Sequence, residues 1–109
     1  MKNNTVYLTD IKEAIEKIEK YTFNVDFEHF KDDDMQQDAV IRQFMVIGEA
    51  TNRLSSDFYD EHPDFPAREA VGMRNLLIHG YDEVNVEVVW KTLQQDIPLL
   101  KEKVLSILS

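Results

Sequence analysis

Apolar residues at helical spacing constrain the fold of this chain more than any other feature. In the last quarter of the sequence they recur every three or four residues, at Val86, Val89, Leu93, Ile97, Leu100, Val104 and Ile107. A near-heptad stripe of this kind buries one face of a long helix against other helices. We predict a last helix from about Asn85, a candidate N-cap, to the C-terminus. A kink is expected at Pro98, which removes a backbone donor.

Two further helices are predicted in the first third of the chain. Helical spacing of Leu8, Ile11, Ile15 and Ile18 indicates the first, with Thr9 or Asp10 placed to cap it. Phenylalanines at Phe23, Phe27 and Phe30 indicate a short second helix, for which Asn24 is a plausible cap.

The middle of the chain predicts a third and a fourth helix around one loop. The third begins near the aspartate run 32–34 and continues to Leu54; because residues 40–47 are apolar nearly all round, it should be the central helix. The loop is 62–66, where two prolines disfavour helix. The fourth helix should run from about Pro66 to His79, with Gly80 in the left-handed position just past its end.

Length and composition agree with one all-α domain. The chain has 109 residues with a 43% hydrophobic share, enough for a single core over residues 1–109, and only three glycines and three prolines. We therefore predict an up-and-down bundle of four to five helices. No stretch has the length of a membrane span and the start lacks a signal-peptide pattern, so we expect a cytoplasmic protein that does not bind membranes.

Several kinds of site are not expected. The chain has no cysteine, which excludes disulfides, thiolate nucleophiles and cysteine-based zinc sites. His29 and His62 lack carboxylate or cysteine partners at ligand spacing, so neither a metal site nor a cofactor is expected. The net charge of −9 argues against a broad nucleic-acid surface. The aspartates at 32–34 are best read as helix-start carboxylates, although a surface for a basic partner is a sharper alternative.

The candidate chemistry is concentrated at the end of the predicted fourth helix. Arg74, Asn75, His79 and Tyr81 lie within eight residues. They combine a fixed positive charge with an imidazole that exchanges protons near neutral pH. The amide of Asn75 lies four residues before His79 and could orient the ring. Tyr81 could donate to a phosphate or accept a modification, or could simply be a half-buried ring with a wet hydroxyl.

Arg74 has both a structural and a functional interpretation. On a helical wheel it lies within an apolar stripe, where a guanidinium needs a salt bridge, an exit at the stripe's edge or a wet cleft. On an ideal helix Arg74 and His79 are roughly 140° apart, so they meet only if the helix unwinds near Gly80 or if two copies contribute to one cleft. Gly72 would let another helix or a ligand come close.

The predicted third helix carries a second polar row, at Asp38, Arg42, Glu49 and Arg53. Ion pairs along a solvated face explain Asp38 and Arg53 best. Arg42 and Glu49 stand in the most apolar part of the chain and are candidates for lining a polar cleft.

These residues resemble a known family. Residues 74–81 match the arginine, four residues, histidine, one residue, tyrosine pattern of HepT-like toxins, which belong to the HEPN superfamily of ribonucleases. Residues 37–42, 47–50, 90–92 and 96–98 are similar to this family in the same order. One departure is visible: Ala67 follows Pro66, where relatives often have tryptophan.

The resemblance implies an all-α HEPN fold and a homodimer that cleaves RNA without metal in a cleft between protomers. It implies Arg74 and His79 as the catalytic pair, with Asn75 and Tyr81 as supporting residues. Internal transesterification is the mechanism that best fits these residue types. It also implies a toxin–antitoxin system, of type II or similar to type VII. The antitoxin would be a nucleotidyltransferase that neutralises the toxin through nucleotide transfer (AMPylation) to Tyr81.

The acidic body of the chain then needs a local positive cleft. Arg42, Arg68 and Arg74 from two protomers could supply it and would favour a defined substrate, such as transfer RNA or messenger RNA. One rival interpretation is a non-catalytic HEPN module that holds nucleotide or RNA, or partners a nucleotidyltransferase. Another is a purely structural dimerising bundle, which leaves the apolar surroundings of Arg74 unexplained.

Overall fold

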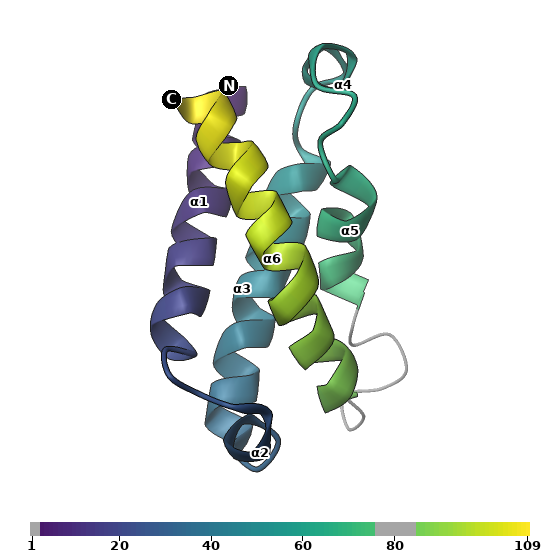
Figure 1. Cartoon of the computed structure of the whole chain (residues 1–109). Coiled ribbons are helices and arrows are strands. Elements are labelled where there is room, and N and C mark those ends of the chain that lie inside the picture. Colours follow the sequence, from purple (N-terminus) through teal and green to yellow (C-terminus); the bar gives the residue numbers. More distant parts are fainter. Residues whose placement is uncertain (1–2, 76–84) are drawn as a thin grey trace.

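The computed structural model describes residues 3–75 and 85–109, with the side chain of Asn75 excepted, and within these ranges every regular element is helical. The three long helices are α1 (Asn4–Tyr21), α3 (Asp34–Asn52) and α6 (Val86–Leu108). The short elements are α2 (Phe27–Phe30), α4 (Ser56–Glu61), α5 (Ala67–Gly72) and the 3₁₀ turn η1 (Met73–Asn75). Figure 1 shows α1, α3, α5 and α6 alternating in direction, which confirms the predicted up-and-down bundle.

Helix α3 is the central helix, as predicted. It packs against α1 on one side and against α5 and η1 on the other. Val40, Phe44 and Ile47 on its inner faces are fully buried. One apolar face of this helix is nevertheless open, because Met45 and Val46 are 43% and 36% exposed. This open face of α3 also carries Glu49.

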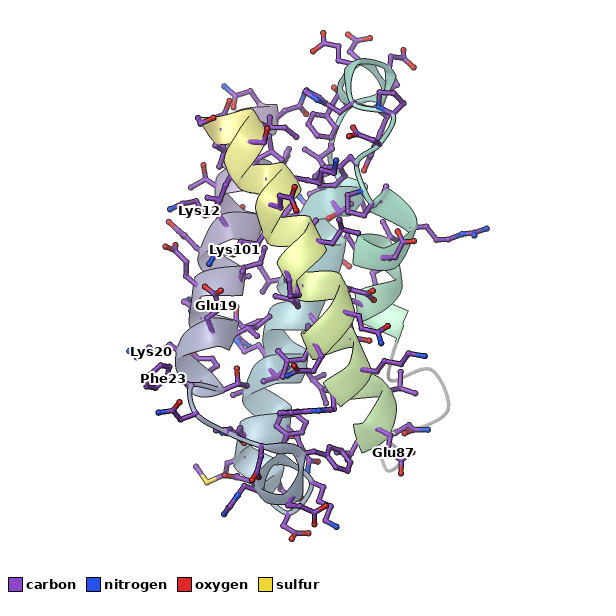
Figure 2. The ribbon with its side chains drawn as sticks, in the orientation of Figure 1. Lys12, Glu19, Lys20, Phe23, Glu87 and Lys101 are labelled. Atoms are coloured by element: carbon purple, nitrogen blue, oxygen red, sulfur yellow. The ribbon has the colours of Figure 1, made fainter. Side chains whose placement is uncertain are left out.

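The predicted C-terminal stripe forms the seam of α6 with the rest of the bundle. Its five central members, from Val89 to Val104, are buried. Asn85 caps the helix as predicted, because its side-chain oxygen accepts from the backbone N–H groups of Glu87 and Val88 at 3.1 and 3.2 Å. Pro98 lies inside the helix without ending it, and the kink stays a prediction. Figure 2 shows Lys101 of α6 facing Glu19 of α1, with Nζ and Oε2 2.8 Å apart.

The predicted cap of the first helix is wrong. Helix α1 begins at Asn4, and the Asn3 side chain caps it by accepting from the Val6 N–H. Thr9 therefore lies inside the helix, where its hydroxyl donates to the Thr5 carbonyl at 2.8 Å. The apolar pattern starts only at Leu8, one turn after the true start, so it could not reveal these exposed first residues.

The cap of the second helix also differs from the prediction. Asp26, not Asn24, accepts from the His29 N–H at the start of α2. Asn24 has a φ of 57°, the left-handed conformation that asparagine tolerates in turns. Phe23 precedes this turn and is 76% exposed at the end of α1 (Figure 2). Phe27 and Phe30 instead pack on Trp90 of α6, with ring centroids 5.8 and 5.1 Å apart.

The region between α3 and α5 contains a helix that was not predicted. Ser55 caps α4, and Phe58 of α4 is buried against Phe65 of the following loop. Side-chain bonds between Ser55 and Asn4 hold this end of the bundle to the start of α1. The sequence pattern predicts no element in this stretch, because a single buried ring is too little to show periodicity.

The start and end of α5 correct the prediction for the fourth helix. The loop at 62–66 is confirmed, and Pro66 is the N-cap rather than the first helical residue. The α-helix ends at Gly72 and tightens into η1, instead of continuing as an α-helix through Asn75. The predicted end at His79 and Gly80 lies outside the described residues. In the described part of the chain, no helix is long and apolar enough to cross a membrane.

The cap of α6 gives a test of this fold. Asn85→Ala removes the acceptor for two N–H groups, so the free energy of unfolding should fall by about 1 kcal/mol in urea denaturation. Gln94→Ala, at an exposed position within the same helix, should change it by less than about 0.5 kcal/mol. Equal effects of the two changes would contradict the assigned start of α6.

Candidate active site

Arg74 lies on the tight turn η1, directly after a buried residue. Met73 is only 2% exposed and holds the turn in the core, whereas the Arg74 side chain is 33% exposed. A 3₁₀ turn advances about 120° per residue rather than 100°. Residues 73–75 therefore depart from the unbroken α-helix for which a separation of roughly 140° between Arg74 and His79 is expected.

The guanidinium of Arg74 is paired with Glu49 on the open face of α3. The distance from Nη1 to Oε1 is 3.2 Å, and the glutamate side chain is 57% exposed. An ion pair this exposed contributes little to stability, typically about 0.2–1 kcal/mol. It engages one nitrogen of a group with five N–H donors, which leaves the guanidinium able to bind a phosphate as well.

The backbone of this turn lies unusually close to α3. A Cβ placed on Gly48 would lie 2.8 Å from Arg74 Cβ and 3.2 Å from both Arg74 Cγ and Arg74 N. Gly48 and Glu49 are consecutive, so one turn of α3 contacts both the root of the Arg74 side chain and its charged end. The polar row predicted on this helix therefore has one member, Glu49, in direct contact with the candidate catalytic arginine.

Two of the remaining candidate cleft residues, Arg42 and Arg68, are exposed. Arg42 lies two turns before Glu49 on the same face of α3, and Arg68 is exposed on α5. A Cβ on Gly72 would meet nothing within 4 Å, so the close neighbour expected there is not supplied by the described part of this chain. The structure thus joins Arg74 to Glu49, leaves Arg42 and Arg68 exposed, and leaves Gly72 partly buried.

His79 and Tyr81, together with the side chain of Asn75, lie outside the described residues. Their convergence with Arg74 stays a prediction. In the described residues, no group of three or more histidine, aspartate or glutamate side chains could hold a metal ion.

His29 corrects one statement made from the sequence. It does have a carboxylate partner, Asp26, three residues earlier, with Nδ1 and Oδ1 2.6 Å apart. This contact raises the pKa of His29, and the His29 backbone N–H and ring lower the pKa of Asp26. Both groups are exposed, and Asp26 already serves as the α2 cap, so the pair is a capping arrangement rather than a second site.

Asp96 is a half-buried carboxylate that the sequence did not single out as a site. Burial in α6 and, second, the carboxylate of Glu69 on α5 raise its pKa, while Lys91 opposes the shift. Sequence inspection could not find it, since the two acids are 27 positions apart and meet only through packing. Ionised Asp96 therefore opposes the contact between α5, which leads into η1, and α6.

Comparison with known proteins identifies the family. Residues 11–107 match the family model described as Ribonuclease HepT-like. The chain belongs to the HepT-like ribonuclease family. The match includes every described helix from α2 to α5, nearly all of α6 and most of α1.

Individual HepT-like relatives support this assignment over most of the chain. A protein of Thermococcus cleftensis named "Probable ribonuclease HepT" is 50% identical over 89% of this chain and 88% of its own length. A protein of Methanocaldococcus jannaschii whose name calls it a candidate RNase is 36% identical over 90% of both chains. A similarly named protein of Caldanaerobacter subterraneus subsp. tengcongensis is 35% identical over 99% of this chain and 96% of its own. No solved structure matches the chain.

The raised pKa of Asp96 predicts a pH-dependent gain of stability on removal of its charge. A raised pKa in the folded state means that stability is lost as pH rises through that pKa. Asp96→Asn should therefore be more stable than wild type at pH 7, by up to about 0.5 kcal/mol, because the group is only half-buried and solvent screens its charge. The gain should shrink as pH falls through the raised pKa of Asp96 and should be absent below 3.8, the ordinary value of the carboxyl. Thermal unfolding at pH 3 and pH 7 measures it, and a variant less stable than wild type at pH 7 would contradict the assignment.

Proposed function

We propose that this chain is a metal-independent endoribonuclease whose catalytic pair is Arg74 and His79. The placement of Arg74 supports this proposal most strongly. Its side chain is partly exposed, and it contacts Gly48 and Glu49 of α3. Arg74 precedes His79 by five residues in the sequence. Membership of the HepT-like ribonuclease family supports RNA as the substrate.

The residue types suit cleavage by internal transesterification. His79 removes the proton from a ribose 2′-OH, and the 2′-oxygen attacks the adjacent phosphorus. The bond from phosphorus to the 5′-oxygen breaks, and a protonated imidazole returns a proton to that oxygen. The products are a 2′,3′-cyclic phosphate and a 5′-hydroxyl. Arg74 stabilises the charge that builds on the phosphate, because its fork of N–H donors matches two phosphate oxygens.

A second copy of the chain completes this site in the proposal. One His79 could serve as base while the other serves as acid, provided that the two rings lie near one linkage. The open face of α3 is suited to such a contact, since the exposed Met45 and Val46 lie beside Arg42 and Glu49. Two copies would also double the number of arginines in the cleft, which gives an acidic chain a local positive surface for RNA.

The partner of this enzyme is proposed from the same chemistry. A nucleotidyltransferase acting as antitoxin would transfer a nucleotide to the Tyr81 hydroxyl, and the added phosphate would place negative charge next to His79 and repel the RNA backbone. The substrate in the cytoplasm would be a defined RNA such as transfer RNA or messenger RNA, because an acidic body disfavours indiscriminate binding.

Single substitutions of the catalytic pair test the proposed activity. Arg74→Ala and His79→Ala should each lower kcat on RNA by about 100-fold or more, as loss of a preorganised charge or of the proton-transfer group does. Cleavage is measured on labelled RNA in EDTA, with detection of the cyclic phosphate. Lys17→Ala removes the same charge as Arg74→Ala from an exposed position on α1 and should leave the rate within about twofold. Wild-type cleavage rates in both Arg74→Ala and His79→Ala would contradict the assignment of these residues as the catalytic pair.

Expression in cells tests the toxin proposal separately. Wild-type chain expressed alone in bacterial cells should arrest growth, and His79→Ala should restore growth at equal protein level. Co-expression with a nucleotidyltransferase encoded beside it should also restore growth and add the mass of a nucleotide to the peptide containing Tyr81. Unchanged growth with a chain that cleaves RNA in vitro would remove the toxin role and leave the enzyme.

A further inference from the structure

We propose that Gly48 is a positioning residue for Arg74, and that only glycine at this place lets η1 seat against α3 with the guanidinium correctly aimed. This inference rests on the proposed function for its effect on catalysis. Its geometric part stands on the described residues alone.

The backbones of α3 and η1 lie very close together at Gly48 and Arg74. The gap of 2.8 Å to Arg74 Cβ is shorter than real Cβ contacts allow, and Arg74 N at 3.2 Å belongs to the main chain. These atoms are at the root of the side chain, so a rotamer change in Arg74 cannot relieve the clash. A methyl group on Gly48 must therefore push the turn away from α3, or push α3 itself.

Helix α3 is held by buried packing around Gly48, so it does not shift to make room for a methyl group. Ile47 before Gly48 is fully buried, and Thr51 one turn later is also fully buried, with its hydroxyl donating to the Ile47 carbonyl at 2.7 Å. This part of α3 is thus packed on its inner side. Displacement falls on η1, which carries Arg74.

A displacement of η1 also moves the charged end of the Arg74 side chain. Glu49 receives the Arg74 guanidinium at 3.2 Å, close to the limit of a hydrogen bond. Moving the turn away from α3 lengthens this contact and releases the guanidinium from its orientation. A misplacement of about 1 Å at a catalytic group can cost on the order of 100-fold in rate.

Helix propensity separates a loss of activity from a loss of stability in the Gly48→Ala variant. Glycine inside a helix costs about 0.5–1 kcal/mol relative to alanine, so Gly48→Ala should favour α3 locally. A loss of activity with unchanged helicity would therefore not arise from unfolding of α3. Gly72→Ala, whose added methyl meets none of the described residues within 4 Å, gives the stability change of a glycine-to-alanine substitution without a clash.

The experiment is a double-mutant cycle on RNA cleavage with Gly48→Ala, Arg74→Ala and the combined variant. Gly48→Ala should lower kcat by about 10- to 100-fold and change KM by less than about threefold, because the aimed charge acts on the transition state. In the Arg74→Ala background the same change should cost nothing further, since Gly48 acts only through that guanidinium. Circular dichroism should show wild-type helix content in each variant.

Two results would overturn the inference. One is a Gly48→Ala enzyme with at least half of the wild-type kcat, and the other is a combined variant in which the two losses simply add. If wild type cleaves no RNA, the proposed function fails instead, and the geometry is read from the guanidinium ¹⁵N resonance of Arg74. Gly48→Ala should then move that resonance as Glu49→Gln does, and an unmoved resonance would refute the positioning role.

Discussion

The contact between η1 and α3 is the constraint on which the candidate site depends. Met73 is buried, Arg74 is partly exposed, and the backbone between them lies against Gly48 with no room for a methyl group. A turn held this closely has few alternative positions, because protein cores are packed to near-crystalline density. The root of the Arg74 side chain is therefore fixed by the main chain, and its charged end is oriented by the contact with Glu49, which is too exposed to hold the side chain alone.

The electrostatics of the site follow from the same arrangement. The chain has a net charge of −9, and Glu49, the carboxylate that contacts Arg74 among the described residues, lies on the open face of α3. A guanidinium in that setting is paired with a carboxylate and has further N–H donors with which the proposed site would bind a phosphate. Because the ion pair is weak, its replacement or extension by a phosphate costs little. An acidic protein can in this way present cationic chemistry at one place without becoming a general RNA binder.

The rest of the bundle supports this place at a distance. Helix α6 crosses the other helices, and Trp90 near its start packs on both rings of α2. The amides of Gln36 and Gln37 on α3 donate to backbone carbonyls at the ends of α1 and α2, so α3 is tied to its neighbours at its start as well as along its core. Asp96 works against the contact between α5 and α6, a local conflict that packing elsewhere must offset.

The amino-acid pattern by itself determined the class of fold and the long helices. The stripe from Val86 to Ile107, its cap at Asn85 and the central position of α3 follow from periodicity and capping chemistry, which are local properties. The resemblance of residues 74–81 to the HepT-like family was likewise read from the sequence, and the family model confirmed membership of the HepT-like ribonucleases.

Only the tertiary structure decided where short elements begin and what the site residues contact. Asn3 rather than Thr9 or Asp10 caps α1, and a turn centred on a left-handed Asn24 precedes α2, because a few exposed residues carry no periodic signal. Three interactions join residues about 25 positions apart. They are the pairing of Arg74 with Glu49, the close approach of Gly48 to Arg74, and the repulsion between Asp96 and Glu69. Helix-wheel reasoning treats each helix alone, whereas such contacts are set by how two helices pack, and that depends on the volume of side chains from the whole core.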